Sequence, residues 1–405
     1  MTVETFGLNV AAPAEPFADA KRRIAATVEA HRTELLELSH RIHANPEPAF
    51  EEHQAAGWVA EALARHGYSV EHPVGSLTTA VRGRLAGGRG GAGPRVGVLA
   101  EYDALPGLGH GCGHNSMAAS GVGAAIGLAA LAPELAGEIV FLGTPAEERG
   151  SGKGVMIRDG LFDRLDAALL YHPSDTTYVE CRLLASEDVY VTFHGQQAHA
   201  ASEPWMGRNA LDALILLFSS VGLWRQQLRP DARVHGIVQE GGTAANIIPS
   251  QTRAWFMVRS PRQDQYLEMR EHFRTMCEAA AAATGCTVEV TFDGGASTMK
   301  HNRILGDRFS ANMAAYGVAD SPPSDNLGSS DMGNVSFVVP TIHPSIAICP
   351  AGVPGHSIEF REAAVSPLGD EVTLLAATLV AQTAYELFAD PSLVEAAWRE
   401  FRADD

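Results

Sequence analysis

Apolar residues along the chain repeat at helical and at strand-like spacing, and the two patterns alternate in the first half. Residues 26–43 and 51–66 carry apolar side chains at helical spacing, and an Asn-Pro-Glu-Pro stretch ends the first of them. Short apolar runs follow, each with turn residues behind it. These runs predict strands at 96–102, 139–144 and 167–171, with helices at 116–131 and 154–159 between them. Strands alternating with helices predict a mixed, mainly parallel sheet flanked by helices, and the Gly/Arg-rich residues 83–94 predict an exposed hairpin or loop.

The pattern changes near residue 185. Strand, helix, strand, strand, helix and strand follow in that order, at 189–193, 209–226, 234–238, 252–258, 263–283 and 287–292. This β-α-β-β-α-β order is typical of a ferredoxin-like α+β domain. We therefore predict a discontinuous domain of residues 1–185 and 297–405, with a second domain of residues 186–296 inserted into it. After the insert the first pattern returns, with a helix at 305–316, a strand at 345–348 and a long final helix at 367–387.

Composition narrows the class of protein. The chain has 405 residues, 46% hydrophobic and 19% charged, which is enough for two domains with cores. A net charge of −18 argues against nucleic acid and anionic membranes as partners. No apolar run approaches the ~18–20 residues that span a bilayer, and the first twenty residues show no secretory signal. Five scattered cysteines fit a reducing compartment, so we expect a cytoplasmic protein.

Side chains of the types that commonly bind metals follow the predicted strands. They are Asp103, Cys112 and His114 after the first strand, Glu147 and Glu148 after the second, His172 after the third, and His356 after the strand at 345–348. Open α/β sheets bind ligands outside the carboxyl ends of their strands. Each cluster alone has an ordinary explanation, such as an acidic helix start or a surface histidine. Together, at one edge of one sheet, they predict a metal site.

The residue types predict the chemistry of this site. Two divalent ions would be held by His114 and Glu148 on one side and by His172 and His356 on the other, with the Cys112 thiolate between them. Glu147 is then free to act as general base on a water that the ions acidify, and to return the proton to a leaving nitrogen. Thiolate and imidazole favour Zn²⁺, Mn²⁺, Co²⁺ or Ni²⁺ over Mg²⁺ or Ca²⁺. This arrangement suits hydrolysis of an amide.

Longer motifs carry a family resemblance over nearly the whole chain. They are Ala100–Pro106, Gly109–Asn115, Gly143–Glu148, His172-Pro173, Ser329–Ser336 and Gly355–Ser357. The chain resembles the M20 metallopeptidase and amidohydrolase family, subfamily D. Within this subfamily, the chain is most similar to the group that holds p-aminobenzoyl-glutamate hydrolase subunits and β-alanyl dipeptidase-like members, because those also have an asparagine at the position of Asn115.

The resemblance implies roles for particular residues. It implies Cys112, His114, Glu148, His172 and His356 as metal ligands, Glu147 as catalytic base, and Mn²⁺ or Zn²⁺ as the ions. The inserted domain is expected to act as a lid and to form a homodimer. Its His199 would steady the oxyanion from the partner subunit, and Asn246 and Arg259 would contact substrate. Glu101 stands where other branches of the family have a ligand histidine, so Cys112 would supply the bridge and Asp103 would orient a ligand.

The leading hypothesis is a metal-dependent amidohydrolase that cleaves an N-acyl amino acid or a dipeptide-like amide. Two alternatives remain. The first is hydrolysis of another C–N bond, such as deamination of an aryl amine, which product analysis would reveal. The second is a non-catalytic binding protein of the same fold, which a failure to bind any metal after reconstitution would favour.

Overall fold

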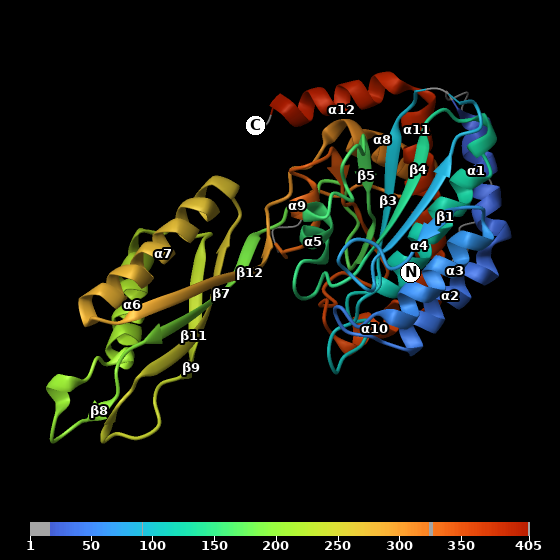
Figure 1. Ribbon diagram of the computed structural model, residues 1–405. Coiled ribbons are helices and arrows are strands. Elements are labelled where there is room, and N and C mark those ends of the chain that lie inside the picture. Colours follow the sequence, from blue (N-terminus) through green and yellow to red (C-terminus); the bar gives the residue numbers. More distant parts are fainter. Residues whose placement is uncertain (1–16, 91, 324–326, 404–405) are drawn as a thin grey trace. The chain divides into compact units, whose positions relative to one another are not determined.

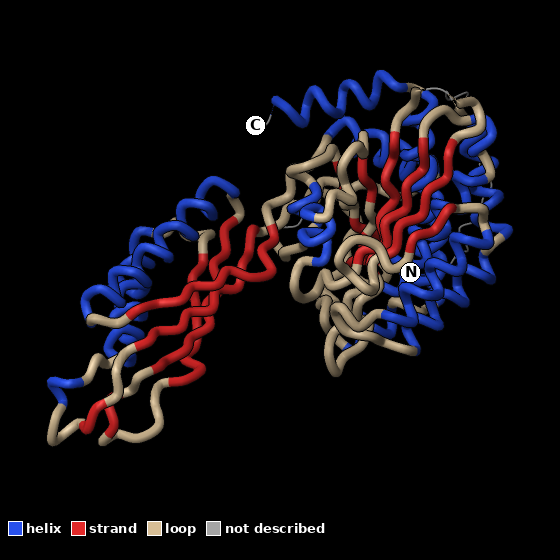
Figure 2. Tube along the Cα trace, viewed as in Figure 1, coloured by secondary structure: helices blue, strands red, loops and turns tan. Residues whose placement is uncertain are grey.

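The computed structural model describes residues 17–90, 92–323 and 327–403. The chain divides into two compact units (Figures 1 and 2). Unit 1 comprises residues 1–182, 299–326 and 334–405, and unit 2 comprises residues 183–298 and 327–333. Residues 1–16, which make up most of the stretch that shows no secretory signal, lie outside the described residues.

A six-stranded sheet organises unit 1, in the order β1-β2-β4-β3-β5-β13. The strands are β1 (Ser69–Glu71), β2 (Val81–Ala86), β3 (Arg95–Glu101), β4 (Glu138–Thr144), β5 (Ala167–Leu169) and β13 (Thr341–Ile342). The pairs β3–β4, β3–β5 and β5–β13 are parallel, whereas β1–β2 and β2–β4 are antiparallel. The predicted mixed, mainly parallel sheet is therefore confirmed. The expectation of an exposed hairpin or loop over residues 83–94 is wrong for residues 83–86, which lie in β2 between β1 and β4 and are not paired with the next strand, β3.

The strand that leads toward His356 does not belong to this sheet, which corrects the prediction of one common edge. A separate parallel ladder joins β6 (His172–Ser174) to β14 (Ser345–Ala347). It continues the pairing of β5 with β13 beyond His343 and Pro344, because the Pro344 carbonyl accepts a hydrogen bond from the His172 N–H at 2.9 Å. Proline has no N–H to donate to a ladder, so the pairing of β5 with β13 stops before Pro344 and begins again as the pairing of β6 with β14.

Helix α4 is the centre of the helical layer of unit 1. Every residue of α4 from His114 to Leu128 is buried, and the helix packs against β3, α1, α2 and α11 (Figure 1). The helices of this unit are α1 (Ala18–Ala30), α2 (Arg32–Ala44), α3 (His53–Arg65), α4 (His114–Ala129), α5 (Gly152–Arg158), α8 (Arg303–Ala315), α10 (Ile358–Ala363), α11 (Pro367–Ala389) and α12 (Pro391–Ala403). A short helix, α9 (Met332–Val335), begins in unit 2 and ends in unit 1.

Two helical predictions need correction. Residues 26–43 are not one helix, because His31 has a non-helical backbone (φ −103°, ψ 11°) and separates α1 from α2. Helix α11 is not the last, since α12 follows at Pro391. Among the described helices, α11 alone is long and apolar enough to cross a membrane by length and composition. Of its most apolar stretch, 83% is buried inside the protein, as in a core helix.

Unit 2 has the predicted β-α-β-β-α-β order. Its elements are β7 (Ala185–His194), α6 (Ala210–Trp224), β9 (Arg233–Glu240), β11 (Gln251–Ser260), α7 (Gln263–Thr284) and β12 (Thr287–Ala296). The strands form an antiparallel sheet in the order β12-β7-β11-β9. Helices α6 and α7 cover one face of it around the buried side chains of Phe193, Phe256 and Phe273 (Figure 1). A two-stranded ladder of β8 (Ala198–His199) and β10 (Ile247–Ile248) completes the unit.

Candidate active site

The turn between β3 and α4 carries Cys112 and His114, and glycine is required at its centre. Gly113 has φ 76° and forms the N-cap of α4. A Cβ at this position would lie 2.7 Å from Cγ of Pro173. Glycine adopts this left-handed backbone without strain, and because it has no side chain, the turn can lie close to the His172-Pro173 segment.

His114 and His172 are each oriented by a hydrogen bond through one ring nitrogen. His114 Nδ1 lies 3.0 Å from Asp103 Oδ1 and 3.0 Å from the Asp103 carbonyl, and His172 Nδ1 lies 2.6 Å from the Pro173 carbonyl. Burial, with His114 nearby, lowers the pKa of His172 to about 4, so this ring is neutral near pH 7. A neutral ring that donates through Nδ1 presents its Nε2 lone pair, as metal-binding histidines do.

Two buried carboxyl groups hold the loop that carries Glu147 and Glu148. Glu148 N–H donates to Asp103 Oδ2 at 2.9 Å, and Ala146 N–H donates to Glu52 Oε1 at 2.8 Å. Ala146 has φ 58°, an unfavourable backbone for a residue with a side chain. These contacts hold the adjacent glutamates in place, and Asp103 joins this loop to His114. The resemblance implied that Asp103 orients a ligand, and its contacts agree with that role.

His356 reaches the same place from the segment after β14. Its N–H donates to the Gly111 carbonyl at 3.0 Å, and its Nε2 lies 3.6 Å from Glu148 Oε2. The backbone is left-handed, with φ 58°. The side chain is exposed, unlike that of His114.

The structure brings all the predicted ligands and Glu147 into three overlapping groups. In each group one ligand atom per residue lies within 4.8 Å of the others: Glu101, His114 and His172; Cys112, Glu148 and His356; His114, Glu147 and Glu148. His114 and Glu148 share a group as we expected, but His172 and His356 do not: His356 lies with Cys112 and Glu148, and His172 lies with His114. The first group also contains Glu101, which the motifs did not predict as a ligand.

Buried polar atoms that form no hydrogen bond suggest that these residues fit a metal. Among the described residues, none forms a hydrogen bond with Glu101 Oε2, His114 Nε2 or Glu148 Oε1, although the first two lie 3.2 Å apart and form an ion pair when the ring is protonated. Buried polar atoms are rarely left unpaired, because that costs about 1–3 kcal/mol each. Burial and the carboxylates of Glu148 and Glu147 also raise the pKa of the Cys112 thiol. A bound cation would reverse that effect and stabilise the thiolate.

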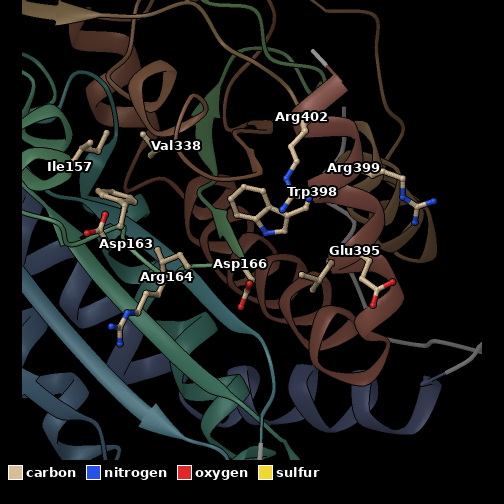
Figure 3. A pocket seen from close by; sticks show the side chains of 12 residues that line it. Ile157, Asp163, Arg164, Asp166, Val338, Glu395, Trp398, Arg399 and Arg402 are labelled. Carbon is tan, nitrogen blue, oxygen red and sulfur yellow. The ribbon is translucent and has the colours of Figure 1, made fainter. Parts of the chain in front are cut away.

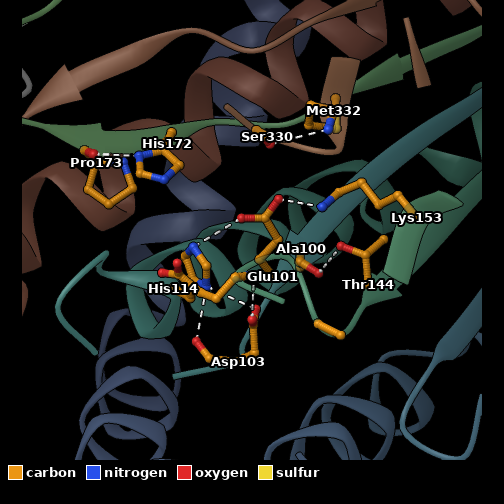
Figure 4. A network of polar contacts seen from close by, with 12 residues as sticks. Ala100, Glu101, Asp103, His114, Thr144, Lys153, His172, Pro173, Ser330 and Met332 are labelled. Carbon is orange, nitrogen blue, oxygen red and sulfur yellow. Dashed lines mark hydrogen bonds and ion pairs between the residues drawn. The ribbon is translucent and has the colours of Figure 1, made fainter. Parts of the chain in front are cut away.

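Three further residues contribute to this region without having been predicted to do so. Lys153 Nζ lies 2.5 Å from Glu101 Oε1, and both side chains are fully buried (Figure 4). The His343 ring packs edge-on against His172 at 5.5 Å between centroids. Glu52 holds Ala146 as described. Glu101, the partner of Lys153, had a local signal, a carboxylate at a strand end, whereas Lys153, which is flanked by glycines, and Glu52, at a helix start, look like surface residues in the sequence.

His199, Asn246 and Arg259 belong to unit 2, and His199 and Asn246 lie together there. His199 is paired with Ile247 in the β8–β10 ladder, next to Asn246, whose carbonyl accepts a hydrogen bond from Ala200 N–H at 3.0 Å. Both residues are exposed. His199 Nδ1 accepts hydrogen bonds from Ala201 N–H at 3.1 Å and Ser202 N–H at 3.2 Å. The neutral ring therefore carries its proton on Nε2.

Arg259 lies far from that pair within the same unit. It is the ninth residue of β11, which begins at Gln251, close to β10. Eight residue steps of about 3.3 Å place Arg259 roughly 26 Å along the strand. Its Nε is buried and has no hydrogen-bond partner among the described residues.

Unit 1 also has a cavity away from these residues. It has a volume of about 850 Å³ and lies between α12 and the segment before β5, lined by Asp163, Arg164, Asp166, Trp398 and Arg402 among others (Figure 3). Asp166 precedes the amino end of β5, whereas His172 follows its carboxyl end. The cavity and the candidate metal site thus lie toward opposite ends of this strand.

Comparisons with known proteins identify the family. The pattern of peptidase family M20/M25/M40 matches residues 97–378. Xaa-Arg dipeptidase of Mus musculus is 37% identical, over 98% of this chain and 97% of its own. A p-aminobenzoyl-glutamate hydrolase subunit of Escherichia coli K12 is 29% identical, over 94% of each.

The fold agrees with that of a solved structure, a dinuclear metal-binding M20 peptidase from Bacillus subtilis. The TM-score is 0.67 at 22% identity, covering 89% of this chain and 99% of the other. The resemblance drawn from the motifs is therefore confirmed for the family. The chain belongs to peptidase family M20/M25/M40 and is a hydrolase of amide bonds.

Proposed function

We propose that this hydrolase uses two divalent metal ions to cleave the amide bond of a dipeptide or an N-acyl amino acid. One observation carries the proposal: ligand atoms of Cys, His and Glu residues converge, some of them buried and without a hydrogen bond, with Glu147 beside them. Cys112, His114, Glu148, His172 and His356 would hold the ions. When bound, such ions polarise a carbonyl and make a water acidic enough to react near neutral pH.

The positions of the two adjacent glutamates support different roles for them. Glu148 occurs both in the group with Cys112 and His356 and in the group with His114, which suits a ligand. Glu147 occurs only in the group with His114 and Glu148. A carboxylate beside the ligands accepts the proton of the attacking water and returns it to the leaving nitrogen.

The tautomer of His199 supports its role as a hydrogen-bond donor to the oxyanion. Two backbone N–H groups occupy Nδ1, so the exposed Nε2 carries the proton. An oriented donor of this kind stabilises the negative charge that develops on the carbonyl oxygen, and losing one costs roughly 3–4 kcal/mol in other hydrolases.

The distance between His199 and Arg259 supports a homodimer in which unit 2 serves two active sites. The roughly 26 Å between the ends of β11 exceeds the length of a dipeptide in extended form, about 7 Å at 3.3–3.6 Å per residue. One copy of unit 2 therefore offers His199 and Asn246 to one substrate and Arg259 to another. The unpaired Arg259 Nε suits a substrate carboxylate, which arginine binds in a two-pronged contact.

The substrate class is tested directly. The protein would be stripped of metal, reconstituted with Mn²⁺ or Zn²⁺, and given Xaa-Arg dipeptides, β-alanyl dipeptides, p-aminobenzoyl-glutamate and N-acetyl amino acids. The first and third of these represent the substrates named for the relatives above. Mass spectrometry of the products should show cleavage of the amide bond in at least one class. Loss of ammonia from an intact aryl amine would contradict the proposal.

Glu147→Gln should abolish turnover while leaving the metal content close to that of the wild type. The amide keeps the size of the side chain but cannot accept the proton, so kcat should fall by about 10²–10⁴-fold. Steady-state kinetics and elemental analysis of the same sample measure both quantities.

Glu138→Gln is the matched control, because Glu138 lies at the opposite end of β4. It should leave kcat and metal content unchanged. A normal kcat in Glu147→Gln would show that another group is the base.

A further inference from the structure

Glu101 and Lys153 form an ion pair in the core of unit 1, beside the candidate metal site. Both side chains are 0% exposed, and Lys153 Nζ lies 2.5 Å from Glu101 Oε1. Burying a charged pair costs several kcal/mol per ion in desolvation, so such pairs need further favourable contacts. This contact of Lys153 is with Oε1, which leaves the role of Oε2 to be explained.

The second oxygen of Glu101 faces His114. Oε2 lies 3.2 Å from His114 Nε2, a contact that is an ion pair only when the ring is protonated, and neither atom forms a hydrogen bond with the described residues. When the ring is neutral and Nδ1 donates to Asp103, Nε2 is the nitrogen that presents a lone pair. Figure 4 shows Glu101 between Lys153 and His114, with its two oxygens toward different partners. Two acceptor atoms that face each other at this distance need a cation or a proton between them.

The spacing suits a metal ion. Two ligand atoms with bonds of about 2.1 Å to one ion lie roughly 3.0–3.4 Å apart. His172 places a third ligand atom within 4.8 Å of the other two. Its Nδ1 lies 2.6 Å from the Pro173 carbonyl, which leaves Nε2 available.

We propose that Glu101 is a sixth protein ligand, which holds one of the two ions together with His114 and His172. Lys153 fixes the orientation of the carboxylate through Oε1 and offsets part of its charge. Cys112, Glu148 and His356 remain as the ligand group for the other ion. The inference rests on the proposed dinuclear function and goes beyond the five ligands that the resemblance implies.

The test titrates metal-free protein with Zn²⁺ alone and measures the number of ions and their affinities by calorimetry. The proteins are the wild type, Glu101→Gln, Lys153→Met and the double variant Glu101→Gln/Lys153→Met. The double variant removes both buried charges, so it stays informative if the single Glu101 variant fails to fold because the buried charge of Lys153 is no longer balanced by this carboxylate.

We expect the wild type and Lys153→Met to bind two ions. Both proteins that lack the Glu101 carboxylate should bind one of the two ions at least about 10–100-fold more weakly, which is the loss seen for outer-shell partners. Glu138→Gln is the control and should bind two ions as the wild type does.

A double variant that binds both ions as tightly as the wild type would show that Glu101 only neutralises Lys153, and would overturn this assignment alone. A wild type that binds no Zn²⁺ would overturn the proposed function together with it. The two failures are therefore distinguishable.

Discussion

At the scale of single residues, buried carboxyl groups position the candidate site more than the metal ligands themselves do. Asp103 accepts hydrogen bonds from His114 through Oδ1 and from Glu148 through Oδ2, so one side chain aligns two ligands. Glu52 accepts hydrogen bonds from Phe50 N–H at 2.9 Å and Ala146 N–H at 2.8 Å. Both carboxyl groups therefore form hydrogen bonds with backbone or ring atoms of the candidate ligands or of residues near them in the sequence.

Glu52 gives the protein a specific dependence of stability on pH. Burial first, and the charge of Asp103 second, raise the pKa of its carboxyl group from 4.5 to about 7. Between these values the folded chain holds a proton that the unfolded chain has released. Stability should therefore fall as pH rises from about 4.5 to about 7, by about 3 kcal/mol, and then stay level.

Glu52→Gln should remove this contribution. Urea unfolding of the metal-free wild type and variant at about pH 5 and about pH 8 would measure it. The variant should lose less stability between the two pH values than the wild type. Glu51→Gln, at an exposed neighbour, is the control, and an equal loss in all three proteins would contradict the prediction.

At the scale of elements, the close packing of α4 on β3 determines where the residues of the candidate site lie. Helix α4 carries His114 at its start, and β3 ends at Glu101. Gly121 lies where the two elements meet, and a Cβ there would be 2.8 Å from Ala100 Cβ and 2.9 Å from the Leu99 carbonyl. The absence of a side chain at this point lets the helix lie directly on the strand.

Gly121→Ala should destabilise the protein by about 1–3 kcal/mol, the usual cost of overpacking a core, and should weaken metal binding because α4 must move from β3. Gly57→Ala is the matched control in α3, where a Cβ would have no neighbour within 4 Å. It should instead stabilise the protein by about 0.5–1 kcal/mol, because alanine favours a helix. Urea unfolding and Zn²⁺ titration measure both effects, and equal behaviour of the two variants would contradict the role of Gly121.

At the scale of the whole molecule, the two units contribute different residues to the proposed reaction. Unit 1 contains every candidate metal ligand and Glu147, and unit 2 contains His199, Asn246 and Arg259. Subunit mixing tests whether they cooperate between chains. Glu147→Gln and His199→Ala should each be nearly inactive alone.

Mixed and reassembled, the two variants should regain part of the wild-type activity. A mixed dimer would combine an intact Glu147 from one chain with an intact His199 from the other. Size-exclusion chromatography and activity of the mixture measure this, with each variant carried alone through the same procedure. No recovery in confirmed mixed dimers would show that His199 acts within its own chain.

Periodicity and motif spacing determined much of this protein without the structure. They predicted the strands β3, β4 and β5, the order of elements in unit 2, and the residues Cys112, His114, Glu147, Glu148, His172 and His356 as one site. These features are local, because each depends on side chains close together in the sequence. The break at His31 is also local, but its signal is weak, since a histidine at that position fits a continuous helix.

Tertiary structure alone decided which of these residues meet. Glu101 pairs with Lys153 across 52 positions, Ala146 is held by Glu52 across 94, and the ladder before His356 joins segments that lie on either side of unit 2 in the sequence. Sequence spacing carries no information on such contacts, because they depend on how helices and strands pack after the chain has folded. The same packing buries the charges of Glu101 and Lys153, and Lys153 in sequence is indistinguishable from a surface residue.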